Sequence, residues 1–145
     1  MIIKKLRESR ERLDLKQTDI ARMLNVDNST VSGWETGKDT IPLTKLILYA
    51  NEFNYSLDYL FGISNKNKKY FPVNINLVLI GDRLKELRKN NKYTQKDIAN
   101  KLNTTQSTIS SYENGNNLIN TTFLYNLSKI YDDISIDDLL GRKKD

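Results

Sequence analysis

The side chains of this chain that are best placed to bind a ligand are small and uncharged. No cysteine or histidine is present, which excludes disulfides, thiol nucleophiles, imidazole bases and the usual zinc ligands. Short hydroxyl and amide side chains on a helix allow close approach to hydrogen-bonding partners such as the edges of DNA bases. Two segments carry such side chains at helical spacing and so define two outer faces: Ser29, Ser32, Gly33 and Thr36 in one, and Ser107, Ser110, Ser111 and Asn114 in the other.

The opposite side of each segment faces inward. At about 100° per residue, the inward-facing sets are Val31, Trp34 and Glu35 in the first segment, and Ile109, Tyr112 and Glu113 in the second. We expect Trp34 and Tyr112 to lie in hydrophobic cores and not to act as stacking surfaces. An ordinary solvated face in so charged a chain would carry Lys or Glu, so the uncharged outer faces indicate a binding surface.

The two segments belong to a repeat with an offset of 78 residues. Of the 49 positions from Leu6 to Asn54, 17 carry the same residue as their counterparts from Leu84 to Asp132. After one extra residue in the second copy, Ser-Leu-Asp-Tyr-Leu-Phe-Gly at 56–62 corresponds to Ser-Ile-Asp-Asp-Leu-Leu-Gly at 135–141. The chain therefore consists of two copies of one unit.

Each copy is expected to fold into five short helices, so the predicted fold class is all-α. The expected elements are second helices over 17–24 and 95–102, third helices that end at Gly37 and Gly115, and a fourth helix over 43–53 whose first turn holds Pro42. A short turn separates the second helix from the third in each copy. This arrangement is that of a helix-turn-helix.

The predicted helix starts differ between the copies. Thr94 and Asp97 form a Thr-x-x-Asp start that is close to a capping box. Lys16 occupies the equivalent cap in the first copy, so that helix should begin less firmly, by about 1 kcal/mol. The other expected N-caps are Asp27 and Thr105 for the third helices, and Ser56 and Ser135 for the last helices.

The repeat sets the expected boundaries. The two domains are predicted over 1–62 and 81–141, joined by a linker over 63–80 that starts extended and becomes helical near residue 77. The basic tail at 142–145 is expected to be frayed and solvated. The acidic pairs at 132–133 and 137–138 lack the spacing of a calcium loop, so we expect them at exposed helix ends.

Composition limits the class of protein. The 145 residues are 28% charged and 38% hydrophobic, which suits two small folded domains. No apolar run approaches the roughly 18 residues of a membrane span, and no signal peptide is evident at the N-terminus, so we expect a cytoplasmic protein without membrane contact. The net charge of +5 would suit a polyanionic partner but does not require one.

The residues of both copies resemble a known family. Gln17-Thr18-Asp19-Ile20-Ala21 with the segment 31–37 (Val-Ser-Gly-Trp-Glu-Thr-Gly), and the matching segments at 94–99 and 108–115, are similar to the Xre/Cro-type family, which includes phage-repressor DNA-binding domains. The closing segments at 56–62 and 135–141 are also typical of it. The resemblance covers about 120 residues and implies two tandem five-helix lambda-repressor-like domains.

The resemblance implies roles for individual residues. Gln17 and Gln95 would contact a phosphate at the start of the second helix, and Asn28 and Gln106 would contact adenine from the start of the recognition helix. The residues implied beside these bases are Ser29, Gly33, Ser107 and Ser111. Those implied at the DNA backbone are Thr36, Lys38, Asn114 and Asn116, and we also expect a contact there from Lys96. Two partly buried ion pairs, which would hold the first helix against the third, are implied between Arg10 and Glu35 and between Arg88 and Glu113.

We expect a sequence-specific regulator of transcription, more often a repressor than an activator, which binds double-stranded DNA without metal or cofactor. No enzymatic activity is expected. The second copy should bind more strongly, because Gly33 offers no side chain and Asp27 would repel a phosphate in the first. The first copy would be a weak reader or would pair two chains as a homodimer. The alternative is an antitoxin-like protein whose helix-turn-helix surfaces bind another protein.

Overall fold

The computed structural model describes residues 1–72 and 74–144 and divides into two compact units. The first unit comprises Met1–Pro72, and the second continues to Lys143. No helix within the described residues is long and apolar enough to cross a bilayer. The predicted all-α fold of two successive five-helix copies is confirmed over this part of the chain.

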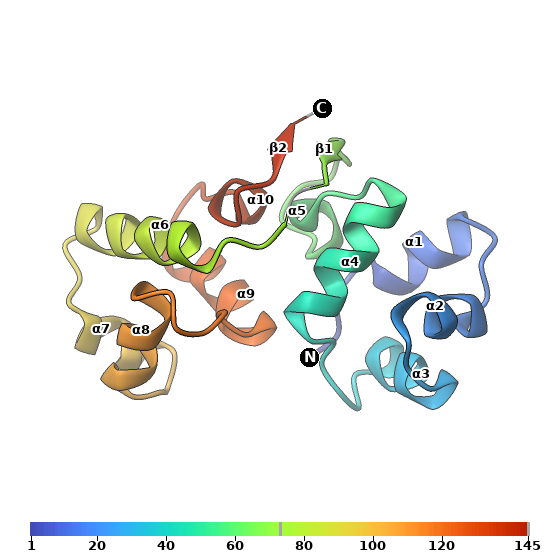
Figure 1. The fold of residues 1–145 in the computed structure, drawn as a ribbon, viewed down its shortest axis with the longest axis horizontal. Coiled ribbons are helices and arrows are strands. Elements are labelled where there is room, and N and C mark those ends of the chain that lie inside the picture. Colours follow the sequence, from blue (N-terminus) through green and yellow to red (C-terminus); the bar gives the residue numbers. More distant parts are fainter. Residues whose placement is uncertain (73, 145) are drawn as a thin grey trace. The chain divides into compact units, whose positions relative to one another are not determined.

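The first unit contains five helices and one short strand in its described residues (Figure 1). These are α1 (Leu6–Arg12), α2 (Gln17–Leu24), α3 (Asn28–Thr36), α4 (Leu43–Phe53), α5 (Leu57–Leu60) and β1 (Tyr70–Phe71). Helix α2 packs against both α3 and α4. The bounds of α2 and α4 are those that the sequence predicts for the second and fourth helices.

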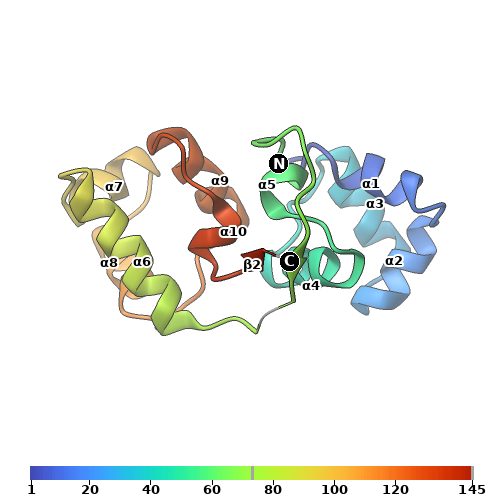
Figure 2. The same ribbon diagram turned by 90° about the horizontal axis from the view of Figure 1, so that it is seen from above.

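The second unit repeats this order. Its helices are α6 (Leu77–Asn90), α7 (Gln95–Lys101), α8 (Gln106–Glu113), α9 (Thr121–Ile130) and α10 (Ile136–Leu139). The short strand β2 (Lys143–Lys144) follows at the end of the described chain. Helix α8 packs against both α6 and α7, and the long helix α6 runs beside α8 in both views of the ribbon (Figures 1 and 2).

The start of the second helix differs between the units as predicted. In α7, the Thr94 hydroxyl accepts the Asp97 N–H at 3.0 Å, and the Asp97 carboxylate accepts the Thr94 N–H at 2.8 Å. In α2, the Asp19 carboxylate accepts the Lys16 N–H at 2.8 Å, but a lysine side chain has no acceptor to return the bond. Only half of the capping box is therefore formed in the first unit.

The remaining caps follow the sequence in three of four positions. The hydroxyls of Ser56, Thr105 and Ser135 each accept a backbone N–H of the helix that follows. Asp27 occupies the N-cap of α3 with extended backbone angles, but its side chain makes no capping hydrogen bond. Asp27 thus has the backbone conformation of the predicted N-cap but lacks its side-chain hydrogen bond.

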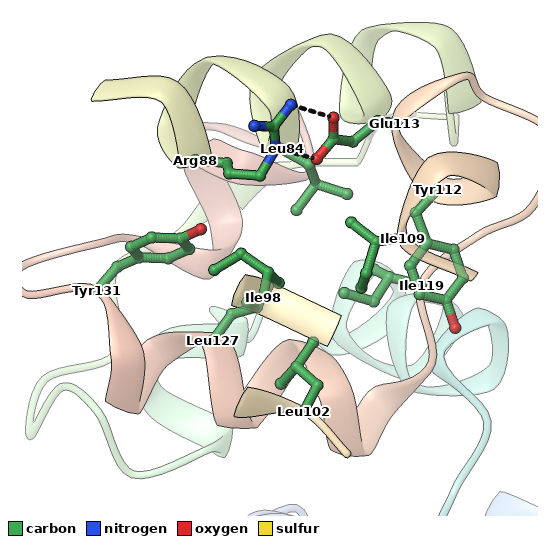
Figure 3. Close-up of a pocket in the computed structure, with 10 residues that line it drawn as sticks. All are labelled: Leu84, Arg88, Ile98, Leu102, Ile109, Tyr112, Glu113, Ile119, Leu127 and Tyr131. Carbon is green, nitrogen blue, oxygen red and sulfur yellow. Dashed lines mark hydrogen bonds and ion pairs between the residues drawn. The ribbon is translucent and has the colours of Figure 1, made fainter. Parts of the chain in front are cut away.

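Each unit encloses its own hydrophobic core. Trp34 is 4% exposed and Tyr112 is 9% exposed, so both lie in these cores as predicted. Figure 3 shows the core of the second unit, where Leu84, Ile98 and Leu127 surround a space of about 20 Å³. Such a space has room for about one water molecule, so it is a packing gap and not a ligand cavity.

Helix α6 begins earlier than α1 does in the first unit. It starts at Leu77, as the change from extended to helical conformation predicts. Ile80 is buried, and a Cβ on Gly81 would lie 2.5 Å from the carbonyl oxygen of Glu113. The structure therefore places residues 77–80 in the second unit, and not in the linker predicted over 63–80.

The predicted solvated tail at 142–145 is wrong for Arg142. This side chain is buried and forms an ion pair with Asp137, which has no exposed surface. Gly141 has a φ of +80°, and this left-handed turn brings the Arg142 N–H to the Asp137 carbonyl at 2.8 Å. The prediction that Asp137 lies at an exposed helix end is wrong for the same reason.

Candidate nucleic-acid interface

A bidentate ion pair fixes the first helix of each unit to the end of the third helix. Arg10 Nε and Nη2 donate to Glu35 Oε2 and Oε1 at 2.7 and 2.8 Å. Arg88 and Glu113 repeat this geometry at 2.7 and 2.9 Å. In both pairs the side chains are at most 11% exposed. The structure thus contains the two ion pairs that the sequence implies, at equivalent positions.

The same arginines also hold the turn that leads into the second helix. Arg10 Nη1 donates to the carbonyl of Leu15 at 2.8 Å, and Arg88 Nη1 donates to the carbonyl of Tyr93 at 2.9 Å. Each guanidinium therefore ties three parts of its unit together. This contact places the start of α2 or α7 next to the carboxylate of the ion pair.

Glu35 remains charged over most of the pH range. Burial raises the pKa of its carboxyl group, but hydrogen bonds from Arg10 and Gln17, together with the positive charges of Arg10 and Arg7, leave the pKa below its ordinary value of 4.5. A group whose pKa is lowered by folding contributes stability above its ordinary pKa, and this contribution is lost as the pH falls through the lowered value. The first unit should therefore lose stability in acid.

The glutamines at the start of the second helix are held by this carboxylate. Gln17 Nε2 donates to Glu35 Oε1 at 3.1 Å, and Gln95 Nε2 donates to Glu113 Oε1 at 3.2 Å. Both glutamines are half-buried at the first position of their helix. An amide nitrogen carries two hydrogens, so one N–H of each glutamine remains for a phosphate oxygen. The carboxylate thus fixes the orientation of the amide group for which the family resemblance implies a phosphate contact.

The start of the third helix is open in both units. Asn28 and Ser29 in α3, and Gln106 and Ser107 in α8, are all exposed. Within the described part of the chain, their side chains make no hydrogen bond to the protein. An amide and a hydroxyl at consecutive exposed positions are therefore available to base edges in each unit.

The middle of the outer face differs between the units. The sequence predicts Gly33 on the open face, but the structure buries it. A Cβ at this position would lie 3.0 Å from Oδ2 of Asp39, whose backbone N–H donates to the Gly33 carbonyl at 3.2 Å. In the second unit, Asn117 Nδ2 donates to the hydroxyl of Ser111 at 2.6 Å. Gly33 therefore cannot face bases itself, because Asp39 covers it.

The residues predicted at the DNA backbone lie on the surface. Thr36, Lys38, Asn114 and Asn116 are exposed at or just after the ends of α3 and α8, and Lys96 is exposed at the second position of α7. The Thr36 hydroxyl donates to the Ser32 carbonyl at 3.0 Å, which leaves its oxygen as an acceptor only. Thr36 is therefore a poor phosphate partner in this conformation, whereas Lys38 and Lys96 form no ion pair with any residue that the structure describes.

Asp39 and Asn117 were not among the predicted site residues, although they are counterparts at the offset of 78. Both follow the recognition helix in an irregular segment, where helical periodicity gives no direction for a side chain. The signal that could have found them is their pairing with Gly33 and Ser111, which are themselves counterparts. A small residue on the helix is matched by an acidic partner in one copy and an amide partner in the other.

The exposed cations of the two first helices differ in their ion pairs. In α1, Arg7 pairs with Glu11 at 2.9 Å, and Arg12 pairs with Glu8 at 3.2 Å. In the described part of the second unit, the ion pairs are those of the buried Arg88 and Arg142. The exposed lysines of that unit therefore form no ion pair among the described residues: Lys85, Lys89, Lys92, Lys96, Lys101 and Lys129.

Both copies match a family of known proteins. Residues 6–60 and 84–139 each match the helix-turn-helix family. The HTH-type transcriptional regulator ImmR of Bacillus subtilis (strain 168) is 43% identical over 63 residues, which is 43% of this chain and 49% of ImmR. The match thus spans about half the length of that relative. No solved structure matches the chain.

Proposed function

Because this chain belongs to the helix-turn-helix family, we propose that it regulates transcription by binding double-stranded DNA at specific sequences, and that it acts as a repressor. The observation that carries the proposal is the open, uncharged start of the third helix, which occurs twice. Asn28 and Gln106 are exposed there with no partner among the described residues. Repression would follow from occupying a promoter.

In the proposed complex, each third helix enters the major groove by its N-terminal end. Asn28 and Gln106 would bond to adenine, with Ser29, Ser107 and Ser111 beside them. The remaining amide N–H of Gln17 and Gln95 would donate to a phosphate, since the other N–H is bonded to a glutamate. Lys38, Lys96, Asn114 and Asn116 would contact the backbone on either side of the groove.

The second copy is proposed as the stronger reader. On its first helix, Lys85 and Lys89 are exposed and form no ion pair within the described residues, whereas Arg7 and Arg12 of α1 pair with Glu11 and Glu8. Electrostatic attraction to phosphates is the main source of affinity for duplex DNA. The first copy would then add sequence preference to a complex that the second copy anchors, or would pair two chains as a homodimer.

A salt titration of binding to a random duplex tests this function. The affinity of the full chain should fall linearly on a logarithmic scale, with a slope of about −0.9 per phosphate contacted. Lys96→Ala should reduce the magnitude of the slope by about one contact. Arg7→Ala is the matched control and should change it less, because Arg7 is already paired with Glu11.

Binding that is absent, or that does not depend on salt, would contradict the proposal. That outcome would favour the alternative in which the exposed helix starts bind a protein, as in an antitoxin-like module. Gln106→Ala adds a second criterion. If this variant weakened binding to all sequences equally, Gln106 would have no role in reading bases.

A further inference from the structure

We propose that Asp39 and Asn117 determine specificity, so that the two copies read different bases at equivalent positions. The inference rests on the proposed function and assigns to Asp39 a preference for cytosine in the half-site that the first copy contacts. Neither residue lies on the recognition helix itself. Both act because the chain after that helix folds back over the middle of its outer face.

In the first copy, Asp39 takes the place of a side chain at position 33. Its backbone N–H is bonded to the Gly33 carbonyl at 3.2 Å, which anchors the segment to α3. Its Oδ2 lies 3.0 Å from the point where a Cβ of residue 33 would be. Asp39 is exposed, and within the described residues no cation or N–H group bonds to its carboxylate. At position 33 this outer face therefore presents the two acceptor oxygens of Asp39.

In the second copy, the same place holds a neutral pair. Asn117 Nδ2 donates to the Ser111 hydroxyl at 2.6 Å, and both side chains are at least partly exposed. The Ser111 hydroxyl keeps its own hydrogen, and the Asn117 amide keeps one N–H and its oxygen. This surface can donate or accept, so it does not demand one type of base edge.

The bases of the major groove respond differently to these two surfaces. Cytosine presents the N4 amine as a donor, guanine presents only acceptors, and thymine presents an acceptor and a methyl group. A carboxylate can bond to the cytosine amine but meets the acceptors of guanine and thymine with unfavourable charge. Adenine presents a donor beside an acceptor and should be intermediate. Asp39 thus favours cytosine mainly by rejecting the other bases.

Selecting bound sequences from a random duplex pool tests the inference with the full chain. The wild-type protein should select two unequal half-sites, of which one carries a cytosine that the other lacks. Asp39→Asn should weaken binding to the cytosine-containing site about tenfold relative to the other three bases at that position. It should leave the second half-site unchanged.

Two further variants sharpen the assignment. Asn117→Asp should create a cytosine preference in the other half-site, because it gives the second copy the acceptor of the first. The double variant Gly33→Ser with Asp39→Asn should convert the base preference of the first copy to that of the second. Asp39→Asn and Asn117→Asp alter exposed positions around retained backbone bonds, so their thermal unfolding midpoints should match that of the wild type. Gly33 is buried, so the double variant is compared at a temperature below its own unfolding midpoint.

The outcomes separate the inference from the function on which it rests. If Asp39→Asn raises affinity for every sequence by one factor and leaves the selected motif unchanged, Asp39 only repels DNA and the inference is overturned. If the wild type selects two identical half-sites, the inference is also overturned, while the proposed function stands. If the wild type binds no duplex, both are rejected.

Discussion

The interiors of the two copies are held by the same contacts, whereas their outer faces carry different side chains. In each copy an arginine of the first helix bonds to a glutamate of the third at 2.7–2.9 Å, and that glutamate holds a glutamine at the start of the second helix. On the outer face, a carboxylate covers Gly33 in the first copy and an amide bonds to Ser111 in the second. The two copies thus share the contacts that position the third helix, while the residues at the middle of the outer face differ.

The copies also differ in how their first helices begin. Ile3 is buried just before α1, whereas its counterpart Gly81 lies inside α6 and in close contact with α8. The glycine allows backbone to approach backbone, and the four residues before it extend the helix. At this position, the first copy therefore packs a buried side chain, whereas the second copy packs the backbone of a longer helix.

The largest effect is expected from breaking one buried ion pair at a time. Glu35→Ala or Glu113→Ala would leave a buried arginine without its carboxylate and should cost about 3–5 kcal/mol of unfolding free energy in the copy concerned. Trp34 is the only tryptophan, so its fluorescence reports the first copy, while circular dichroism reports both. In a urea titration, Glu35→Ala should move the fluorescence transition to a lower urea concentration.

Glu113→Ala should shift the circular dichroism transition alone. If it shifted the fluorescence transition equally, the two copies would unfold as one unit. A separate free energy of unfolding could then not be assigned to each copy.

Gly81→Ala should have the next largest effect, and only in the second copy. The added Cβ would lie 2.5 Å from a backbone oxygen of α8, so helix α6 must move, at a cost of about 1–3 kcal/mol. Urea unfolding followed by circular dichroism measures the loss. Lys85→Ala on the same helix is the control, because an exposed substitution should stay within about 0.5 kcal/mol. An unchanged midpoint for Gly81→Ala would show that α6 and α8 are packed less closely than described.

The third prediction concerns the recognition of DNA bases by the first residues of α3 and α8. Gln106→Ala should weaken the best DNA site by about 1–3 kcal/mol and relax one base position. Asn28→Ala should weaken it less, because we propose that the first copy binds DNA less strongly. Fluorescence anisotropy with labelled duplexes that differ at single positions would measure both. A larger loss for Asn28→Ala would reverse the assignment of the stronger copy.

The smallest effects are expected at the caps of the second helices. Thr94→Ala removes an acceptor and should cost about 1 kcal/mol, whereas Lys16→Ala should cost almost nothing. Lys16→Thr should stabilise the first copy by a similar amount, since the Asp19 half of the capping box is already formed. Urea unfolding by fluorescence follows the first copy. No gain from Lys16→Thr would mean that another contact limits the start of α2.

Much of this arrangement can be predicted from the sequence because it depends on local rules. The repeat, the helix bounds and the caps at Ser56, Thr94 and Ser135 follow from residue type and spacing. The core positions of Trp34 and Tyr112 follow from helical periodicity. These features need no knowledge of how the chain runs between the helices.

The features that the sequence did not predict lie where the chain leaves a helix. Asp39 reaches Gly33 because a backbone hydrogen bond folds the segment after α3 over the helix. Arg142 reaches Asp137 because Gly141 turns the chain back. In both places the direction of a charged side chain depends on a few backbone angles in irregular structure, about which hydrophobic periodicity says nothing.

The buried position of Arg142 has a practical consequence for dividing the protein. A second domain prepared alone and cut after Gly141, where the repeat ends, would deprive Asp137 of its cationic partner in the interior. Such a fragment should be less stable by about 3–5 kcal/mol, enough to unfold many small domains. Expression of this half, or fusion of a reporter to it, should therefore retain Arg142 and keep the junction beyond it.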